Sequence, residues 1–318
     1  MNFLQQLEEL RRKTPRLFNI NIGSENSDYC THSDKNKNSY LLFAANYCED
    51  SMYSGLLVEC TDCVDCTYAE KCELCFECTD AYSCYNCTYS QLVKNCSDSS
   101  FCYDCVGCRN CFGCVGLTQK EYCYFNQQLT KEAYLEAIKQ YDVKNPEHVQ
   151  FAFDERRKLE LTIPRRAVRM INSEQCTGDN IYNSKNCDQC FDLHDSQDSI
   201  HLNDCWRTND SVDLSFSDGS ELCYECFSIG LGCYNDNFCN YIRGSSDCEY
   251  SELLFSCKNC FGCVSLQSKE YYILNEPYSK DDYFKKVAEI KAQMNADGTY
   301  GKHIISSYKF EDTAAAEV

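Results

Sequence analysis

The most constraining feature of this sequence is the spacing of its cysteines. From Cys30 to Cys123, every cysteine stands at a residue number divisible by three. A strand buries every second residue and an α-helix every third or fourth, so neither gives this spacing. Long 3₁₀-helices are uncommon, and polyproline II would need more Pro or Gly. The spacing therefore predicts a chain wound into narrow coils, with very short strands separated by tight turns.

The length of one coil follows from arranging these positions in columns. With twelve residues per coil, one column contains only cysteine: Cys48, Cys60, Cys72, Cys84, Cys96 and Cys108. Two other columns mix Cys with Ser, and the fourth is the most apolar, with Ala45, Leu57 and Ala69 among its members. A coil of eighteen residues loses this order. We therefore expect four inward-facing residues per coil and a spacing of about 4.8 Å between coils.

Cysteine suits the interior of such a coil because it is small, polarizable and only weakly polar. The chain has 29 Cys and 24 Tyr, which together make up much of its 43% hydrophobic content, so few Leu, Ile, Val and Phe remain for a core. We therefore expect small thiols to fill a lumen that is too narrow for large side chains. The outward positions carry Asp, Glu, Asn, Thr and Tyr.

The chain also aligns with itself at an offset of 149 residues. The segment from Cys108 to Asn126 recurs as Cys257 to Asn275. Such self-similarity indicates two copies of one unit. We predict a first unit at 1–145, a second at 146–296 and a tail at 297–318.

The second copy keeps the three-residue phase less strictly than the first. Its cysteines from Cys187 to Cys226 share one phase and those from Cys233 to Cys263 share the next, so one residue is inserted between Cys226 and Cys233. Gly230 and Gly232 lie at this point, which predicts a bulge at a turn.

Amphipathic segments flank the cysteine-rich stretches. Apolar residues recur at helical spacing after each stretch, from Tyr134 and from Tyr283, and Ser279 begins a capping-box pattern before the second. A leading helix from Phe3 should end before Pro15. We expect these helices to cap the coils. The predicted fold class is mainly β, with two tandem narrow β-solenoids of about 12-residue coils, each flanked by short capping α-helices.

Charge and hydropathy narrow the possible partners and compartment. There are 30 Lys and Arg against 49 Asp and Glu, a formal net charge of -19, which disfavours direct binding to nucleic acid or anionic lipid. No apolar stretch is long enough for a transmembrane helix, and the N-terminal segment has no uninterrupted apolar core of a signal peptide. We therefore expect a cytoplasmic protein whose cysteines are free or bound to metal.

Repeated Cys-x-x-Cys spacing is the strongest chemical signal. Two such pairs in adjoining coils could surround one ion with four sulfur atoms, as zinc prefers, and thiolates also suit Cu(I) and iron–sulfur clusters. The candidate metal ligands are Cys60, Cys63, Cys72, Cys75, Cys102, Cys105, Cys108, Cys111, Cys114, Cys257, Cys260 and Cys263. However, Ser and Ala alternate with Cys in the same columns, as packing by size would produce. We therefore favour a structural role and expect no cofactor, with zinc, Cu(I) or Fe–S as the alternative.

The columns resemble the β-solenoid antifreeze proteins of beetles, without their Thr-x-Thr ice face. That resemblance implies disulfides within coils, here the pairs Cys60/Cys66, Cys72/Cys78, Cys96/Cys102 and Cys108/Cys114. Cys48 and Cys84 would instead face serines. Over nearly its whole length, motifs such as SENSDY, KNSYLLF, CELCFECTD, NCFGCV and PRRAVRMINSEQCTGD resemble an uncharacterised cysteine-rich repeat family of uncultured small-genome bacteria. That family implies architecture only.

Catalysis has little support in the sequence. The histidines His32, His148, His194, His201 and His303 show no regular pairing with a thiol column, and no Gly-rich phosphate loop is present. We expect a non-enzymatic structural scaffold or interaction module that binds a protein partner or itself. One alternative is a thiolate protein that binds or stores metal. Another is an acidic mimic of nucleic acid that inhibits a basic partner.

Overall fold

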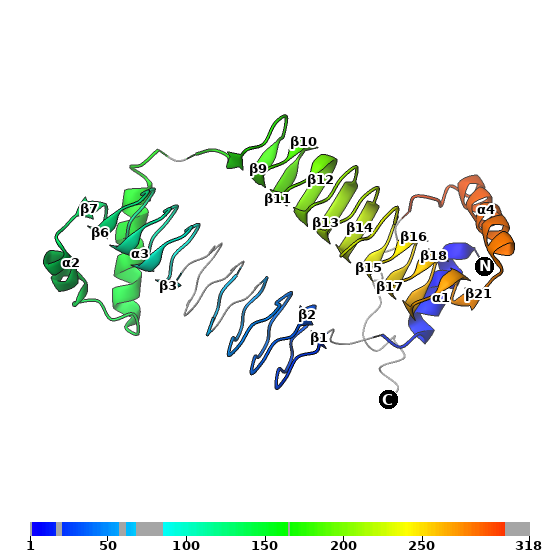
Figure 1. Cartoon of the computed structure of the whole chain (residues 1–318), viewed down its shortest axis with the longest axis horizontal. Helices are drawn as coiled ribbons and strands as arrows, with labels where there is room; N and C mark the ends of the chain where they lie inside the picture. Colours follow the sequence, from blue (N-terminus) through cyan, green and yellow to red (C-terminus); the bar gives the residue numbers. More distant parts are fainter. Residues whose placement is uncertain (1, 17–20, 57–61, 68–84, 165, 303–318) are drawn as a thin grey trace. The chain divides into compact units, whose positions relative to one another are not determined.

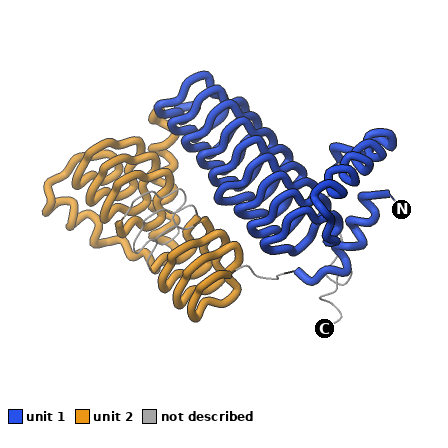
Figure 2. The backbone as a smooth tube through the Cα atoms, turned by 45° about the vertical axis from the view of Figure 1, so that its right-hand side comes forward, with its two compact units in different colours: residues 1–16, 166–318 blue, residues 17–165 orange. Residues whose placement is uncertain are grey.

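A computed structural model describes residues 2–16, 21–56, 62–67, 85–164 and 166–302. The chain divides into two compact units, one formed by residues 17–165 and the other by residues 1–16 and 166–318 (Figure 2). Each unit contains a β-solenoid of stacked, parallel coils together with helices (Figure 1). The mainly β fold with narrow stacked coils that the cysteine spacing predicts is confirmed.

The unit at 17–165 contains the first solenoid. Its helices are α2 (Lys131–Ile138) and α3 (Pro146–Glu160). Its strands are β1 (Asn21–Ile22), β2 (Ser33–Asp34), β3 (Tyr85–Thr88), β4 (Ser97–Ser100), β5 (Arg109–Phe112), β6 (Glu121–Tyr124) and β7 (Gln127–Gln128). Strands β3 to β7 form one sheet in sequence order, and single parallel bridges join the coils between 25 and 67.

The other unit contains the second solenoid, with α1 (Phe3–Lys13) and α4 (Lys280–Ala296). Its strands are β8 (Met170–Ile171), β9 (Gly178–Tyr182), β10 (Lys185–Asp188), β11 (Cys190–His194), β12 (Gln197–Trp206), β13 (Val212–Asp218), β14 (Tyr224–Gly230), β15 (Asn240–Arg243), β16 (Ser246–Glu249), β17 (Glu252–Phe255), β18 (Lys258–Phe261), β19 (Val264–Gln267), β20 (Glu270–Ile273) and β21 (Glu276–Pro277). All pairs are parallel except the hairpin of β20 and β21.

The strand register gives the coil length directly. Cys111 pairs with Cys123, and Leu193 pairs with Cys205, so partners are mostly twelve residues apart in both solenoids, although Met170 pairs with Ile181, eleven residues on. Ile229 pairs instead with Ile242, thirteen residues on. The twelve-residue coil and the residue inserted between Cys226 and Cys233 are both confirmed.

Each coil is built from a repeating unit of three residues with fixed roles. Cys30 is buried and faces inward, Thr31 bridges to the next coil, and His32 is left-handed with a φ of 57°. Left-handed residues other than glycine are strained unless they are Asn or Asp. One left-handed column accordingly begins Asn26, Asn38, and the Asn26 Nδ2 donates to Asn38 Oδ1 at 2.9 Å.

The ladder between coils uses only part of the backbone. The N–H of Thr31 donates to the carbonyl of Leu42 at 2.9 Å, and the N–H of Ala44 donates to the carbonyl of Thr31 at 3.0 Å. Bridging and left-handed residues therefore supply the ladder donors. The N–H of each inward-facing residue needs another acceptor, which has to come from the lumen.

The lumen accepts larger side chains than expected. Leu42 lies in the first solenoid, and Ile181, Leu193 and Leu202 are among the fully buried residues of the second. The expectation that only small side chains fit is therefore wrong for the second solenoid, where aliphatic residues alternate with Cys and Ser and fill the space together.

The helices take two different positions. Helix α2 packs on β6 through Tyr134, and α4 packs on β20 through Tyr283, so these two cover the last coils as expected. Ser279 caps α4 by accepting from the N–H of Asp282 at 3.2 Å, as its sequence pattern predicts.

Helix α1 precedes the first solenoid in sequence, and α3 precedes the second. Helix α1 packs with the second solenoid and α3 with the first, so the compact units do not follow the predicted boundaries at 1–145 and 146–296. The physical reason is an apolar surface on the late coils of each solenoid, which buries Phe3 and Leu7 in one unit and Ala152 in the other.

Candidate functional site

The candidate metal ligands that the structure describes all lie in a lumen. They are buried and free of disulfide bonds: Cys63, Cys102, Cys105, Cys108, Cys111, Cys114, Cys257, Cys260 and Cys263. Cys60, Cys72 and Cys75 lie outside the described residues, as do Cys78 and Cys84. Cys102, Cys108 and Cys114 form no disulfide, so the pairs Cys96/Cys102 and Cys108/Cys114 implied by the antifreeze resemblance are not bridged.

The thiols donate hydrogen bonds to backbone carbonyls. The Cys96 thiol lies 3.4 Å from the carbonyl of Lys94, two residues before it, and 3.4 Å from that of Cys105, nine residues after it. The Ser90 hydroxyl makes the same two contacts, at 3.1 and 3.5 Å, with Thr88 and Ser99. Cys and Ser therefore occupy equivalent places because both are small donors.

The same side chains also accept hydrogen bonds from the backbone N–H groups of inward-facing residues that do not donate to the ladder between coils. The Ser51 Oγ accepts from the N–H of Cys63 at 3.3 Å, and the Cys96 Sγ accepts from the N–H of Cys108 at 3.4 Å. The residue twelve positions earlier is the partner in both cases. The spacing of the cysteines does not reveal this requirement, although the recurrence of Ser, Cys and Asn in the inward columns is a signal for it.

Burial determines the protonation state of isolated thiols. It raises the pKa of Cys205, Cys223 and Cys233 to about 12, because a thiolate would lose its hydration there. These thiols are neutral at physiological pH and poor nucleophiles.

The densest run of cysteines behaves differently because its thiols contact one another. Hydrogen bonds from Cys105, Cys111 and Cys96 lower the pKa of Cys108. The same contact with Cys108 raises the pKa of Cys111. Within the described residues, no three His, Cys, Asp or Glu side chains are grouped so that they could hold one metal ion.

One carboxyl group is buried in the second lumen. Asp236 is 0% exposed, and its Oδ1 accepts from the N–H of Cys248 at 2.8 Å. Its Oδ2 has no hydrogen-bond partner among the described residues. Burial raises its pKa to about 8. The spacing of the cysteines places Asp236 at an inward position, in a column that otherwise carries Cys and Ser.

The described histidines lie outside the lumens, and His303 is outside the described residues. His194 stacks between Tyr182 and Trp206, with ring centroids 4.5 and 4.2 Å apart. His201 lies 2.8 Å from Asp213, on the neighbouring coil. These contacts join successive coils and place no imidazole next to a lumen thiol.

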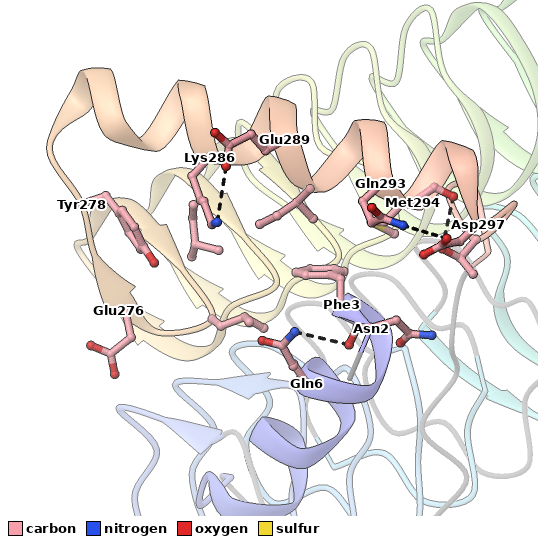
Figure 3. A pocket seen from close by; sticks show the side chains of 14 residues that line it. Asn2, Phe3, Gln6, Glu276, Tyr278, Lys286, Glu289, Gln293, Met294 and Asp297 are labelled. Carbon is pink, nitrogen blue, oxygen red and sulfur yellow. Dashed lines mark hydrogen bonds and ion pairs between the residues drawn. The ribbon is translucent and has the colours of Figure 1, made fainter.

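A cavity of about 480 Å³ lies between α1, α4 and the last coil of the second solenoid (Figure 3). Phe3, Ile273 and Met294 give it apolar walls. Lys286 and Glu289 lie on its rim and form an ion pair at 3.4 Å. This arrangement follows from the packing of two helices on one end of a solenoid, and it brings together no candidate nucleophile and base.

The early coils of the first solenoid carry exposed apolar residues on adjoining outward columns. We call this set the aromatic strip: Tyr29, Tyr40, Leu41, Phe43, Met52 and Tyr53. Tyr29 and Tyr53 are 61% and 55% exposed. Tyr40 contacts both of them edge to face, with centroid distances of 5.5 and 5.8 Å. Contiguous apolar surface of this kind is characteristic of binding sites.

No helix in the described part of the chain is both long enough and apolar enough to cross a bilayer. No family model matches the sequence, and no curated protein matches it. Among solved structures, the UDP-N-acetylglucosamine O-acyltransferase LpxA from Moraxella catarrhalis RH4 aligns at 8% identity and a TM-score of 0.14, covering 86% of this chain and 93% of that one. The UDP-N-acetylglucosamine acyltransferase from Campylobacter jejuni aligns at 7% identity and a TM-score of 0.11, covering 87% and 90%. Similarity at this level carries no information about activity.

Proposed function

We propose that this protein is a non-enzymatic scaffold or interaction module, in which the lumen is structural and the outer surfaces make the contacts. The observation that carries the proposal is the hydrogen bonding inside the lumen. Thiols and hydroxyls there donate to backbone carbonyls and accept from inward N–H groups. Lumen thiols that are used in this way and whose pKa burial raises, such as Cys205, Cys223 and Cys233, are poor nucleophiles.

Thiol labelling tests this role. Among the described cysteines only Cys176 is not fully buried. We therefore expect native protein treated with a maleimide to label quickly at Cys176 and slowly at the lumen cysteines, with full labelling after denaturation. A Cys176→Ser variant provides the control and should lose the fast phase. Rapid native labelling of Cys108 or Cys111 would contradict a structural lumen.

The thiolate metal-binding alternative is favoured by one observation, the run of mutually contacting thiols around Cys108, whose pKa is lowered. Elemental analysis of anaerobically purified protein distinguishes the two roles. A structural lumen predicts less than one metal ion per chain and tolerance of Cys111→Ser, since Ser99 occupies the same column one coil earlier. A metal site predicts bound metal that this substitution reduces.

The proposed role also fits a reducing compartment such as the cytoplasm, because free thiols persist there. Partners would be proteins or a second copy of the chain, since the net charge of -19 disfavours nucleic acid and anionic lipid.

A further inference from the structure

We propose, on the basis of the function above, that the aromatic strip binds an amphipathic α-helix of a partner protein, and that this helix presents an apolar face flanked by basic residues. Within its own unit, no helix of the described residues runs beside the two successive coils that hold β1 and β2, whereas α3 runs beside the coils that hold β4 to β6 (Figure 1). The strip therefore lies on a solenoid that already binds a helix elsewhere.

The strip and the surface under α3 occupy the same positions of the twelve-residue period. Tyr29 and Leu41 stand at a left-handed position, and Tyr89 and Phe101 follow at multiples of twelve residues. The first two are exposed, while Tyr89 and Phe101 are buried in the cluster that contains α3. One face of the first solenoid is therefore apolar on the late coils, where α3 covers it. The same face is also apolar on the early coils, where no described helix of this unit covers it.

The contacts of α3 show how such a helix is held. Phe153 packs edge to face on Tyr89 and on Phe101, with centroid distances of 5.6 and 5.3 Å. Arg156 donates to the carbonyl of Tyr89 at 3.4 Å and lies over the ring of Tyr103 at 5.8 Å. The carbonyl of Tyr89, a left-handed residue, therefore serves as the acceptor for a basic side chain of the helix.

The second solenoid binds α1 in the same way. Phe3 packs against Tyr250 and Phe261, with centroid distances of 5.8 and 4.8 Å. Arg11 pairs with Glu252 at 3.2 Å. Helices α1 and α3 therefore each use an aromatic residue together with an arginine to contact the coils.

The charge around the aromatic strip favours a partner helix with basic residues. Asp28 and Asp65 are exposed at its two ends, in the same columns as Tyr40 and Tyr53. Basic residues that flank the apolar face of a helix complement these carboxylates, and opposite charges raise the rate of association. An acidic helix or an anionic lipid surface would be repelled.

A labelled peptide with the sequence of residues 145–162 serves as the probe, with a covalent staple joining positions 150 and 154 because both side chains are exposed on α3. The staple offsets the low helicity of an isolated segment of this length. Fluorescence anisotropy measures its binding to the full chain. We expect saturable binding that weakens at least tenfold in a Tyr29→Ser/Tyr53→Ser variant, since buried aromatic contacts dominate such interfaces.

Two controls make the result specific. Tyr47→Ser removes a tyrosine that is 55% exposed and lies outside the strip, and it should leave binding unchanged. A peptide carrying Phe153→Ser should not bind. The absence of saturable binding up to about 1 mM, or equal binding to the strip variant, would overturn the proposal.

Size-exclusion chromatography with light scattering addresses the competing occupant, a second copy of the chain. A wild-type dimer that becomes a monomer in the strip variant, with no peptide binding, would assign the strip to self-association and overturn the helix proposal. Thiol labelling is independent of both readouts. A reactive lumen would therefore defeat the scaffold role without affecting the peptide titration.

Discussion

Replacing the buried carboxyl of Asp236 by an amide should stabilise the second solenoid at alkaline pH. Asn36 shows what the amide would do at a lumen position. Its Oδ1 accepts from the N–H of Cys48 at 2.9 Å, and its Nδ2 donates to the carbonyl of Ala45 at 2.9 Å. Asp236 makes the first kind of bond, to Cys248, but an ionised Oδ2 has no proton for the second.

The size of the effect follows from the pKa of Asp236, which burial raises to about 8 from an ordinary value near 3.9. Because the folded state holds its proton more tightly than the unfolded state, the contribution of this group to stability is fully present below about pH 4. This contribution decreases as the pH rises from about 4 to about 8, and above that pH the ionisation of the group no longer changes the stability. A shift of this size corresponds to a loss on the order of 5 kcal/mol.

Urea unfolding of the wild type and Asp236→Asn at pH 5, 7 and 9 tests this reasoning. Trp206 is the only tryptophan and lies in the same unit, so its fluorescence reports on the relevant solenoid. The variant should gain stability relative to the wild type from pH 5 to pH 9, whereas Asp210→Asn, an exposed control, should keep the wild-type pH profile. Thiol ionisation in the unfolded state affects all three proteins and cancels. Parallel profiles for the wild type and Asp236→Asn would refute the assignment of a neutral buried carboxyl.

Three further predictions concern the coils and their helices. Ala44→Gly should stabilise the first solenoid by up to about 1 kcal/mol, because Ala44 has a φ of 51°, while Ala133→Gly in α2 should destabilise it by about 1 kcal/mol; urea unfolding followed by circular dichroism measures both. Cys96→Ser should cost less than about 1 kcal/mol and Cys96→Ala about 1–3 kcal/mol, because only alanine leaves an inward N–H without its acceptor. A fragment of residues 166–302 should melt at a higher temperature when a peptide of residues 1–16 is added, because the peptide restores the buried helix α1.

Each of these predictions has a clear contrary outcome. Equal effects of glycine at positions 44 and 133 would mean that left-handed strain is unimportant. Equal stability of the serine and alanine variants of Cys96 would mean that the lumen is held by packing alone. If the melting temperature of the fragment does not change when the peptide is added, α1 contributes nothing to the stability of its unit.

The coil could be predicted from the sequence because its period is imposed by one simple constraint. A side chain faces the lumen at every third residue, and only small or neutral side chains repeat there, so Cys48, Cys96 and Cys108 reveal the twelve-residue coil by position alone. The inserted residue before Cys233 is visible for the same reason, since it shifts the phase of every later cysteine.

The candidate site could be predicted only in part. Spacing alone makes Cys102 to Cys114 resemble a metal-binding sequence, but the hydrogen bonds that these thiols donate to carbonyls are set by backbone directions that spacing does not contain. The aromatic strip was missed because tyrosines scattered over several columns gain meaning only when adjoining columns are identified as one face.

The period, the inward columns and the presence of flanking helices were determined by the sequence itself, because each depends on residues near one another in the chain. The pairing of α1 with the second solenoid and of α3 with the first was decided only in the tertiary structure. The sequence shows that Phe3 and Phe153 are apolar but not which solenoid buries them. That choice depends on aromatic residues that the coils bring together from positions far away in sequence.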